Sequence, residues 1–251
     1  MKKINKTLVN ILKKKKKREE YGLFVAEGKK IVFELLKSGE LEVVAVFVRE
    51  DVWQYDFELN AIFQKVNIKD FKRISSLETA QGFLAVVKMP TYINDDIILS
   101  YPVIALDRIQ DPGNLGTIIR TADWFGIDTV VCSKGSVDVF SPKVVQASMG
   151  AIARVRVYYM DLYEFIDNQI NKGFPVYAMV MNGENVYEKH LESHAIYLFG
   201  NESKGISKEL FTHKVLPTTI PNFSNKKHKS ESLNVSVSVS VIMTLLRINN
   251  Y

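Results

Sequence analysis

Cysteine is nearly absent from this chain: Cys132 is the only one among its 251 residues, so no disulfide can form within them. A chain without disulfides fits a reducing compartment such as the cytoplasm. There is no run of about 18 uninterrupted apolar residues, so no membrane span is expected. The basic N-terminal segment has no apolar centre and does not match a secretory signal. We therefore expect a cytoplasmic globular protein with no membrane partner.

Several familiar cofactor signatures are also missing. No G-x-G occurs, which argues against the usual dinucleotide-binding loop, and there is no Walker A sequence. His190 and His194 stand four residues apart, but the first is not followed by Glu and no third ligand is in view. We interpret both as surface residues and expect no metal site. Cys132 lies in an apolar run and is expected in the core.

Positive charge is concentrated at one end of the chain. Residues 1–30 hold 11 Lys and Arg against 3 acidic residues, whereas the remaining 221 hold 22 against 25. Such a cluster attracts a polyanion by releasing its condensed counterions. The same cluster could be a solvated tail that only aids solubility, and charge alone leaves both interpretations open. Its centre is the run Lys13, Lys14, Lys15, Lys16, Lys17 and Arg18.

The hydrophobic pattern predicts two domains. In residues 1–88, helical spacing over 29–36 and apolar runs at 41–48 and 83–87 indicate a small α/β unit. Residues 89–97 are polar, contain a proline and lack periodicity, which is typical of a linker. From residue 98 to 251, apolar strands alternate with amphipathic helices, which predicts an α/β domain with a mainly parallel sheet.

The stretch 111–120, DPGNLGTIIR, is the most informative motif. Pro112 and Gly113 form a turn, and Asn114 stands where a helix N-cap belongs. The apolar residues that follow share one helical face, and Arg120 falls roughly opposite to it. Arg120 is therefore expected to point into solvent or a cleft. Taken alone, this pattern also suits an ordinary capped surface helix.

Two further polar segments follow downstream. Gly200, Asn201 and Glu202 come directly after the apolar run 196–199, at the end of a strand where open α/β sheets bind ligands. The second segment contains Ile220, Ser232, Leu233 and Asn234. The Val/Ser alternation of 235–241 is locally typical of a strand, but Val239, Ile242 and Leu246 also fall at helical spacing.

In this order, the three motifs resemble the signature of the SpoU/TrmH family of RNA ribose 2′-O-methyltransferases. The residues around 24–31 and 79–86 are similar to the ribosomal-protein-like RNA-binding domain that precedes many of these enzymes. The resemblance implies a trefoil-knotted, SPOUT-type α/β domain, a homodimer, and S-adenosylmethionine as the methyl donor. It also implies that 235–246 form a helix. The chain departs from the family in its connection 222–231, which is longer, lysine-rich and free of glycine.

The resemblance further implies roles for individual residues. Arg120 would activate the ribose hydroxyl as a base, or act as an electrostatic clamp on a phosphate or developing alkoxide. Asn114 and Glu202 would orient Arg120, and Ser232 and Asn234 would shape the loop near the substrate. The cofactor would be held near Gly200, Asn201, Ile220 and Leu233.

The substrate implied is RNA, with ribosomal RNA favoured over transfer RNA because of the N-terminal RNA-binding domain. On that interpretation, the run Lys13–Arg18 is expected to contact RNA. A knotted RNA-binding or ribosome-assembly protein without catalysis is the alternative. The altered connection 222–231 favours it, and the intact polar motif residues argue against it.

Overall fold

The computed structural model describes residues 4–54, 62–90, 99–212, 214–226, 228 and 230–249. The chain forms two compact units. The N-terminal unit comprises residues 1–93 and 138–154, and the C-terminal unit comprises 94–137 and 155–251. Segment 138–154, which the sequence pattern placed in the C-terminal domain, thus packs within the N-terminal unit. Most of the predicted linker 89–97 lies outside the described residues.

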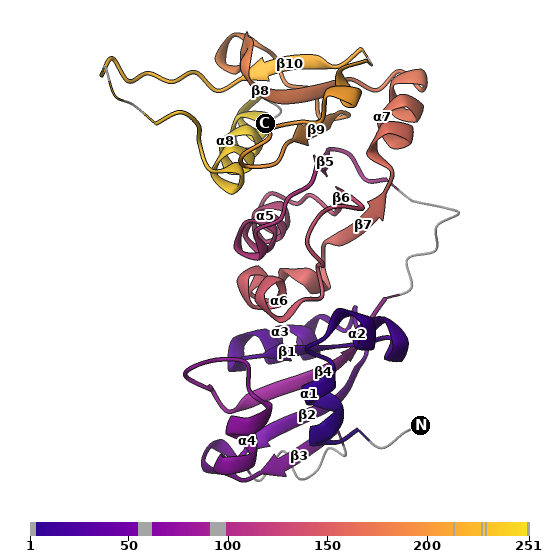
Figure 1. The fold of residues 1–251 in the computed structure, drawn as a ribbon, viewed down its shortest axis with the longest axis vertical. Helices are drawn as coiled ribbons and strands as arrows, with labels where there is room; N and C mark the ends of the chain where they lie inside the picture. Colours follow the sequence, from indigo (N-terminus) through magenta and orange to yellow (C-terminus); the bar gives the residue numbers. More distant parts are fainter. Residues whose placement is uncertain are drawn as a thin grey trace. The chain divides into compact units, whose positions relative to one another are not determined.

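The N-terminal unit is built around a four-stranded sheet in the order β1-β4-β2-β3 (Figure 1). β4 is antiparallel to both β1 and β2, and β3 runs parallel to β2. Its strands are β1 (Leu23–Glu27), β2 (Val43–Arg49), β3 (Phe63–Val66) and β4 (Phe83–Lys88). Its helices are α1 (Lys6–Ile11), α2 (Lys15–Tyr21), α3 (Lys29–Ser38), η1 (Glu50–Val52), α4 (Ile68–Ile74), α6 (Pro142–Ser148) and η3 (Ala151–Ala153).

The basic N-terminal segment is folded rather than a frayed tail. Helix α1 buries Leu8 and Val9, and its C-cap residue Leu12 is buried as well. They share a core with Phe47 of β2 and Phe71 of α4. This burial fixes the start of α2, which carries most of the lysine run. Helical spacing spreads those lysines around the helix, so they differ in exposure.

The C-terminal unit has six strands, and every neighbouring pair in its sheet is parallel, in the order β10-β8-β9-β5-β6-β7. The expected α/β fold with a mainly parallel sheet is confirmed. Its strands are β5 (Val103–Leu106), β6 (Thr129–Ser133), β7 (Arg156–Met160), β8 (Val176–Asn185), β9 (Ile196–Phe199) and β10 (Leu216–Thr219). Its helices are α5 (Pro112–Trp124), α7 (Leu162–Asn171), η4 (Val186–Glu188), η5 (Lys208–Thr212) and α8 (Val235–Asn249).

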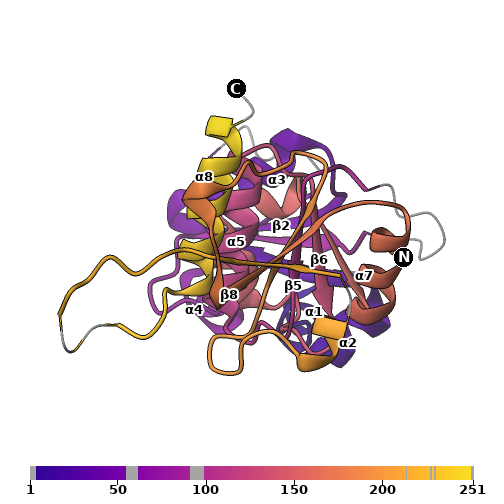
Figure 2. The same cartoon turned by 90° about the horizontal axis from the view of Figure 1, so that it is seen from above.

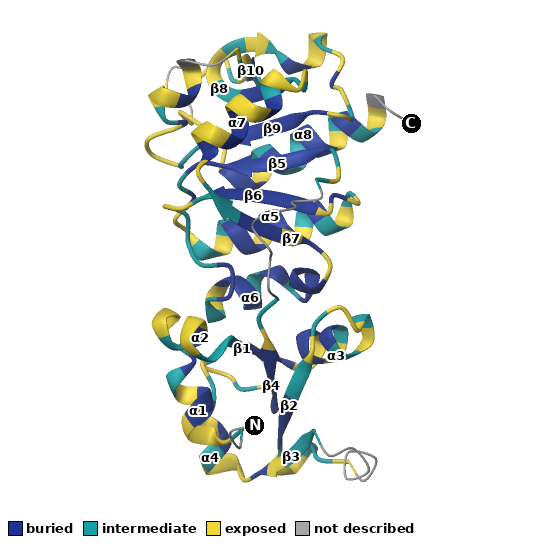
Figure 3. Ribbon diagram, turned by 90° about the vertical axis from the view of Figure 1, so that its right-hand side faces the viewer, coloured by how far each residue is buried: buried dark blue, intermediate teal, exposed yellow. Residues whose placement is uncertain are grey.

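Both faces of this sheet are covered, and its central strands β5, β6 and β9 are buried along almost their whole length (Figure 3). Val103 and Ala105 of β5 pack with Phe165 and Ile166 of α7. Because side chains alternate along a strand, Ile104 and Leu106 face the opposite side of the sheet. Strands buried on both faces have nearly continuous apolar sequences, which is how they appeared in the sequence.

Residues 235–249 form the helix α8, as the family resemblance implied and against the local Val/Ser alternation. Its buried residues Val239, Ile242 and Leu246 recur at helical spacing. The hydroxyls of Ser240 and Thr244 donate to the carbonyls four residues earlier, at 2.9 and 2.8 Å, so the helix itself satisfies them. Small serine side chains also let α8 lie closely beside α5 (Figure 2).

Candidate functional site

Helix α5 begins three residues earlier than the sequence motif suggested. Asp111 is its N-cap, and a carboxylate oxygen of Asp111 accepts the Asn114 backbone N–H at 2.8 Å. Pro112 occupies the first turn, where its missing N–H costs nothing. The prediction that Asn114 caps this helix is therefore wrong. Asn114 instead stands in the first turn with its side-chain amide available to other partners.

The loop after β9 is a tight turn that only glycine permits. Asn201 and Gly205 exchange two backbone hydrogen bonds of 3.0 and 2.9 Å, which closes the loop. A Cβ on Gly200 would lie 2.2 Å from the Gly205 carbonyl carbon, closer than any real contact. The side-chain oxygen of Asn201 accepts the N–H groups of Ser203 and Lys204, both at 3.0 Å. This rigid turn carries Glu202 at its tip.

The third motif is anchored by the start of α8. The side-chain oxygen of Asn234 accepts the Ser236 backbone N–H at 2.9 Å and the Ser236 hydroxyl at 2.6 Å, so Asn234 caps the helix. This leaves its side-chain NH2 to reach outward, where it donates to Asn114 Oδ1 at 2.9 Å.

Asn114 joins the three motifs into one polar network. It accepts from Asn234 and donates through Nδ2 to Glu202 Oε1 at 2.8 Å. A carboxylate can only accept, so the orientation of the Asn114 amide is dictated by Glu202. Asn201 donates to the Arg108 carbonyl at 2.8 Å and approaches Glu202 at 3.4 Å. Residues up to 120 positions apart in the sequence thus hold one another in place.

A cleft of about 890 Å³ opens beside this network. Its walls come from the middle of β8, the loop after β9 and the segment from β10 to α8. All four residues expected to bind the cofactor line it: Gly200, Asn201, Ile220 and Leu233. Glu202 and Ser232 line it as well, whereas Asn114 and Asn234 lie at its edge through their bonds to Glu202 and to each other.

Close backbone approach shapes the floor of the cleft. β10 shifts register against β8 between Pro217 and Thr218, where Gly183 lies next to it. A Cβ on Gly183 would be 2.5 Å from the Thr218 backbone nitrogen. The segment 222–231, longer than in the family pattern, forms part of the rim through Phe223, whose side chain is 75% exposed. Figure 2 shows this segment between β10 and α8 reaching away from the sheet.

Arg120 is exposed on α5, as its spacing predicted. Its partners differ from the expectation, however. Within the described residues, no hydrogen bond or ion pair joins Arg120 to Asn114 or Glu202, so these two residues do not orient it within one chain. Six residues separate Arg120 from Asn114, about 9 Å along the helix axis and on another side of it.

The basic run divides into exposed and engaged residues. Lys14, Lys15 and Lys16 are exposed. Lys17 pairs with Glu20 at 2.6 Å, and that hydrogen bond raises the pKa of Lys17. Lys13 donates to the Ser75 carbonyl at 3.0 Å.

Arg18 is a correction to the expected RNA-contacting set. It is only 3% exposed, donates to the Leu12 and Lys13 carbonyls, and pairs with Asp138. These contacts make it a structural residue of the N-terminal unit rather than one available to RNA.

A second pocket, of about 290 Å³, was not foreseen from the sequence. It lies at the carboxyl ends of β5, β6 and β7 and is lined by Asp107, Arg108 and Ser207 among others. Asp107 directly follows the apolar strand β5, and this position could have indicated a polar site from the sequence. Nothing in the sequence marks Arg108.

Metal and thiol chemistry find no support in the side chains described. Across the described ranges, no three His, Cys, Asp or Glu side chains gather where they could hold a metal ion. No helix among those residues is long and apolar enough to span a membrane. Cys132 is buried in β6, and burial raises the pKa of its thiol well above the usual range.

Comparison with known proteins places this architecture in a family. Residues 101–244 match the model of the SpoU rRNA Methylase family, and residues 4–85 match the MRM3-like substrate binding domain. The first match covers more than half of the chain and contains all three motifs. The chain therefore belongs to the SpoU methylase family, as the motif resemblance had indicated.

Individual relatives agree over nearly the whole length. The chain is 30% identical over 235 residues to the 23S rRNA (guanosine(2553)-2'-O)-methyltransferase RlmP of Bacillus subtilis, covering 93% of this chain and 92% of RlmP. A TrmH-family structure from Porphyromonas gingivalis is 33% identical with a TM-score of 0.84, covering 96% of each chain. An AdoMet-bound rRNA methyltransferase from Sinorhizobium meliloti is 27% identical with a TM-score of 0.82, covering 98% of this chain and 95% of that one.

Proposed function

We propose that this protein is an S-adenosylmethionine-dependent methyltransferase that methylates a ribose 2′-hydroxyl in RNA, with ribosomal RNA as the substrate. The observation that carries the proposal is the Asn234–Asn114–Glu202 network at the edge of the 890 Å³ cleft. It brings together the three motifs that define the family, each with its polar side chains intact.

The cleft suits the cofactor. It is large enough for a molecule of this size, and its walls mix apolar side chains such as Met181, Phe199 and Leu233 with polar loops. A Cβ on Gly200 or Gly183 would meet the protein's own backbone, so these glycines let the loop after β9 and the contact between β8 and β10 pack closely at the cleft. We assign the holding of S-adenosylmethionine to Gly200, Asn201, Ile220 and Leu233. When bound, it supplies an electrophilic methyl group on its sulfonium.

The residues of the network would orient the nucleophile. A ribose hydroxyl is a weak nucleophile at neutral pH and gains from positioning and from stabilisation of the developing alkoxide. Glu202 is fixed by Asn114 and offers a carboxylate oxygen at the cleft, and Ser232 adds a hydroxyl on the same wall. A guanidinium is a poor base, because it carries five N–H donors and no acceptor, so we propose that Arg120 acts as an electrostatic clamp.

The N-terminal unit supports the choice of ribosomal RNA. It matches a substrate-binding domain model, and the relative RlmP is named for a 23S rRNA nucleotide. The exposed Lys14, Lys15 and Lys16 on α2 would contribute sequence-independent contacts to phosphates. An RNA substrate of this kind favours a cytoplasmic location, which the single reduced cysteine also suits.

We further propose that the protein is a homodimer joined through α5 and α8. On α5, Trp124 is 84% exposed and lies one turn beyond Arg120 on the same face. On α8, Val237 and Ile248 are 47% and 68% exposed and eleven residues apart, which puts them on one face. A second copy covering these apolar residues would enclose Arg120 and complete the pocket around it.

The trefoil knot belongs to the same proposal. The strand order supports it, because β9 inserts between β5 and β8 while β10 returns to the outer edge beside β8. The segment from β10 to α8 then leads back to α5, which begins far earlier in the chain. Family members with this order of elements are knotted, an exception to the usual rule of unknotted folds.

The test is transfer of labelled methyl from S-adenosylmethionine to unmodified ribosomal RNA and, separately, to unmodified transfer RNA. We expect label in ribosomal RNA alone. Label in transfer RNA alone would keep the chemistry and change the substrate. RNA binding with neither cofactor binding nor transfer would favour the non-catalytic alternative.

A further inference from the structure

Arg108 has a backbone conformation that its side chain disfavours. Its φ is +53°, a region that glycine and asparagine adopt readily and other residues rarely. Among the described residues, only Met149 shares this property without being glycine. Strained residues of this kind persist where the surroundings hold them and often mark functional sites.

The surroundings hold Arg108 from both sides. Its backbone N–H donates to the Ser133 hydroxyl at 2.8 Å, and its carbonyl accepts from Asn201 at 2.8 Å. Asn201 is also the residue that closes the loop carrying Glu202. Gly135 leaves space for the arginine stem, since a Cβ there would lie 3.3 Å from Arg108 Cγ. Arg108 is thus tied directly to the loop that forms the candidate active site.

The guanidinium is only partly used by the protein. Its Nε lies 3.4 Å from Asp107 Oδ1, makes no hydrogen bond within the described residues, and is buried. The other carboxylate oxygen of Asp107, Oδ2, accepts the N–H and the hydroxyl of Ser207 at 2.8 and 2.5 Å. No hydrogen bond to the described residues engages the two terminal nitrogens of Arg108, and its side chain is 37% exposed.

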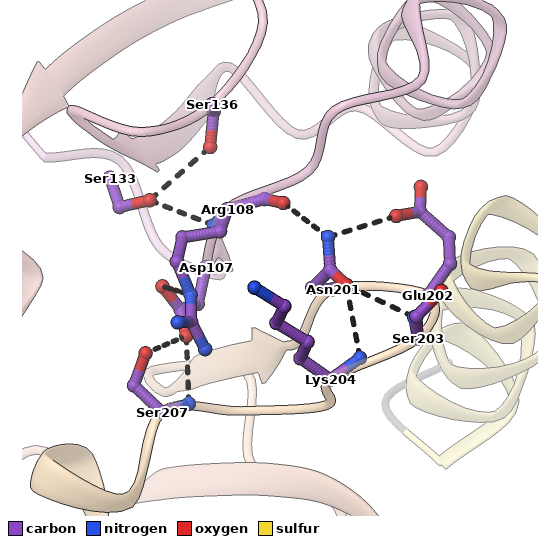
Figure 4. Close-up of polar contacts among 9 residues, drawn as sticks. All are labelled: Asp107, Arg108, Ser133, Ser136, Asn201, Glu202, Ser203, Lys204 and Ser207. Carbon is purple, nitrogen blue, oxygen red and sulfur yellow. Dashed lines mark hydrogen bonds and ion pairs between the residues drawn. The ribbon is translucent and has the colours of Figure 1, made fainter.

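The loop that Asn201 joins to Arg108 also carries a second cation, Lys204. Figure 4 shows the Lys204 side chain extending from this loop toward Arg108. Lys204 is exposed, and its position is fixed by the bond from its backbone N–H to Asn201. Two cations held close together without a shared carboxylate repel each other unless an anion lies between them.

The pocket itself balances this charge on its other side. Asp161 and Glu209 line it together with Lys134 and the half-exposed ring of Tyr163. Asp161 caps α7 by accepting two backbone N–H groups. An anion is therefore favoured where Arg108 meets Lys204 rather than beside α7, and Tyr163 offers an aromatic face of the kind that stacks on nucleotide bases.

We propose that Arg108 and Lys204 form a seat for a backbone phosphate of the RNA substrate, which positions the target nucleotide against the loop of Glu202. The proposal rests on the proposed function and adds to it a substrate contact through two residues, of which Arg108 lies outside the three motifs. Arginine provides planar paired donors that suit a phosphate, and lysine adds a point charge. The strained backbone conformation of Arg108 directs its side chain toward this seat.

The experiment measures binding of a labelled single-stranded 16-nucleotide oligouridylate, and of unmodified ribosomal RNA, over a range of salt concentrations. The variants are Arg108→Asn, which suits a positive φ, and Lys204→Ala. The control is Lys172→Ala, which removes the same charge from an exposed residue at the C-terminal end of α7. This end of α7 leads into the start of β8, whereas the pocket lies at the carboxyl ends of the strands. Thermal unfolding checks that each variant is folded.

We expect Arg108→Asn and Lys204→Ala each to weaken RNA binding roughly tenfold at moderate salt. The double variant should lower the slope of log affinity against log salt by about 0.7, the value for one neutralised phosphate on a single strand, and each single variant by less than that. Because both cations hold one phosphate, the affinity of the double variant should fall by less than the product of the two single effects. Lys172→Ala should leave the slope unchanged.

Affinity for S-adenosylmethionine, measured by calorimetry on the same proteins, separates the possible failures. Unchanged RNA slopes with weakened cofactor binding would mean that the seat holds the cofactor's carboxylate, which overturns the proposal. Unchanged slopes and unchanged cofactor binding would assign Arg108 a purely structural role. If the wild-type protein itself neither binds the cofactor nor transfers methyl, the proposed function fails, whatever the slopes show.

Discussion

Gly200 is the residue on which the shape of the cofactor cleft depends most directly. Its Cα packs against the backbone of Gly205 and Ile206, where a Cβ would lie 2.2 and 2.3 Å from backbone atoms that have no rotamer to change. The two hydrogen bonds between Asn201 and Gly205 hold the loop closed over this contact. A side chain here must push the loop open.

We therefore expect Gly200→Ala to abolish measurable cofactor binding in calorimetry and to lower the free energy of unfolding by about 2 kcal/mol. Ser203→Ala is the control, since Ser203 is exposed in the same loop and bonds to Asn201 through its backbone. Normal cofactor affinity in Gly200→Ala would show that the loop adapts and that the cleft is not built on this contact.

At the residue scale, the sequence predicted several residues that line the cleft but not the contacts between them. Gly200, Asn201, Ile220 and Leu233 all line the cleft, as expected from the motifs. The Asn114 hydrogen bonds were missed because they join residues 88 and 120 positions apart. A sequence motif does not tell how far its side chains lie from those of another motif. Arg18 was grouped with the exposed cations because it directly follows a run of lysines. That prediction was wrong, because its side chain is buried.

Helix α2 is the element that presents positive charge. Its exposed lysines stand on a helix held by the buried α1, so they form a surface rather than a loose tail. Deleting residues 1–18 would also remove the buried Leu8, Val9 and Leu12, and it would confuse removal of charge with disruption of the core. Point substitutions avoid this.

Replacing Lys14, Lys15 and Lys16 with alanine should weaken RNA binding and flatten its salt dependence, by about 0.7 in slope for each phosphate that is no longer neutralised. The free energy of unfolding should barely change, since surface substitutions cost little. The matched triple replacement of Lys37, Lys69 and Lys72, also exposed, should leave the slope near that of the wild type. Equal flattening by both triples would mean that total charge, and not α2, governs binding.

Helix α8 shows where local sequence patterns fail. The alternation of Val and Ser over 235–241 is that of a strand, yet the segment is helical because apolar residues at helical spacing continue to Leu246. The serine hydroxyls donate hydrogen bonds to carbonyls four residues earlier in the same helix, so they are satisfied without breaking it. Periodicity over a longer window, rather than over seven residues, was the informative signal.

For the whole molecule, the proposed dimer would be joined through the exposed apolar residues on α5 and α8. We expect Trp124→Glu to convert a dimer into a monomer in sedimentation analysis, because a buried carboxylate without a partner is costly at an interface. Methyl transfer should fall with it if Arg120 needs a second copy around it. Ile68→Glu is the control, since Ile68 is also exposed but lies on α4 of the N-terminal unit.

A wild-type protein that is monomeric at micromolar concentration would contradict the proposed dimer. A monomeric Trp124→Glu variant with full activity would keep the dimer but separate it from catalysis.

The parallel sheet and its order of helices and strands could be predicted well, since buried strands and amphipathic helices leave strong local patterns. The division of the chain was predicted less well. Segment 138–154 continues the sequence pattern of the C-terminal domain yet packs within the N-terminal unit, where Asp138 pairs with Arg18 and Arg154 with Glu34. Such long-range pairs follow from the fold and leave no periodic trace.

The most direct test of ribose methylation is to locate the methyl group in the RNA product. Unmodified ribosomal RNA is incubated with the protein and labelled S-adenosylmethionine, then hydrolysed in alkali, which cleaves beside free 2′-hydroxyls only. We predict label in an alkali-resistant dinucleotide for the wild type, and none for Arg120→Ala despite normal cofactor binding. Label in ordinary mononucleotides would place the methyl on a base and contradict ribose methylation, and full labelling by Arg120→Ala would remove that arginine from the chemistry.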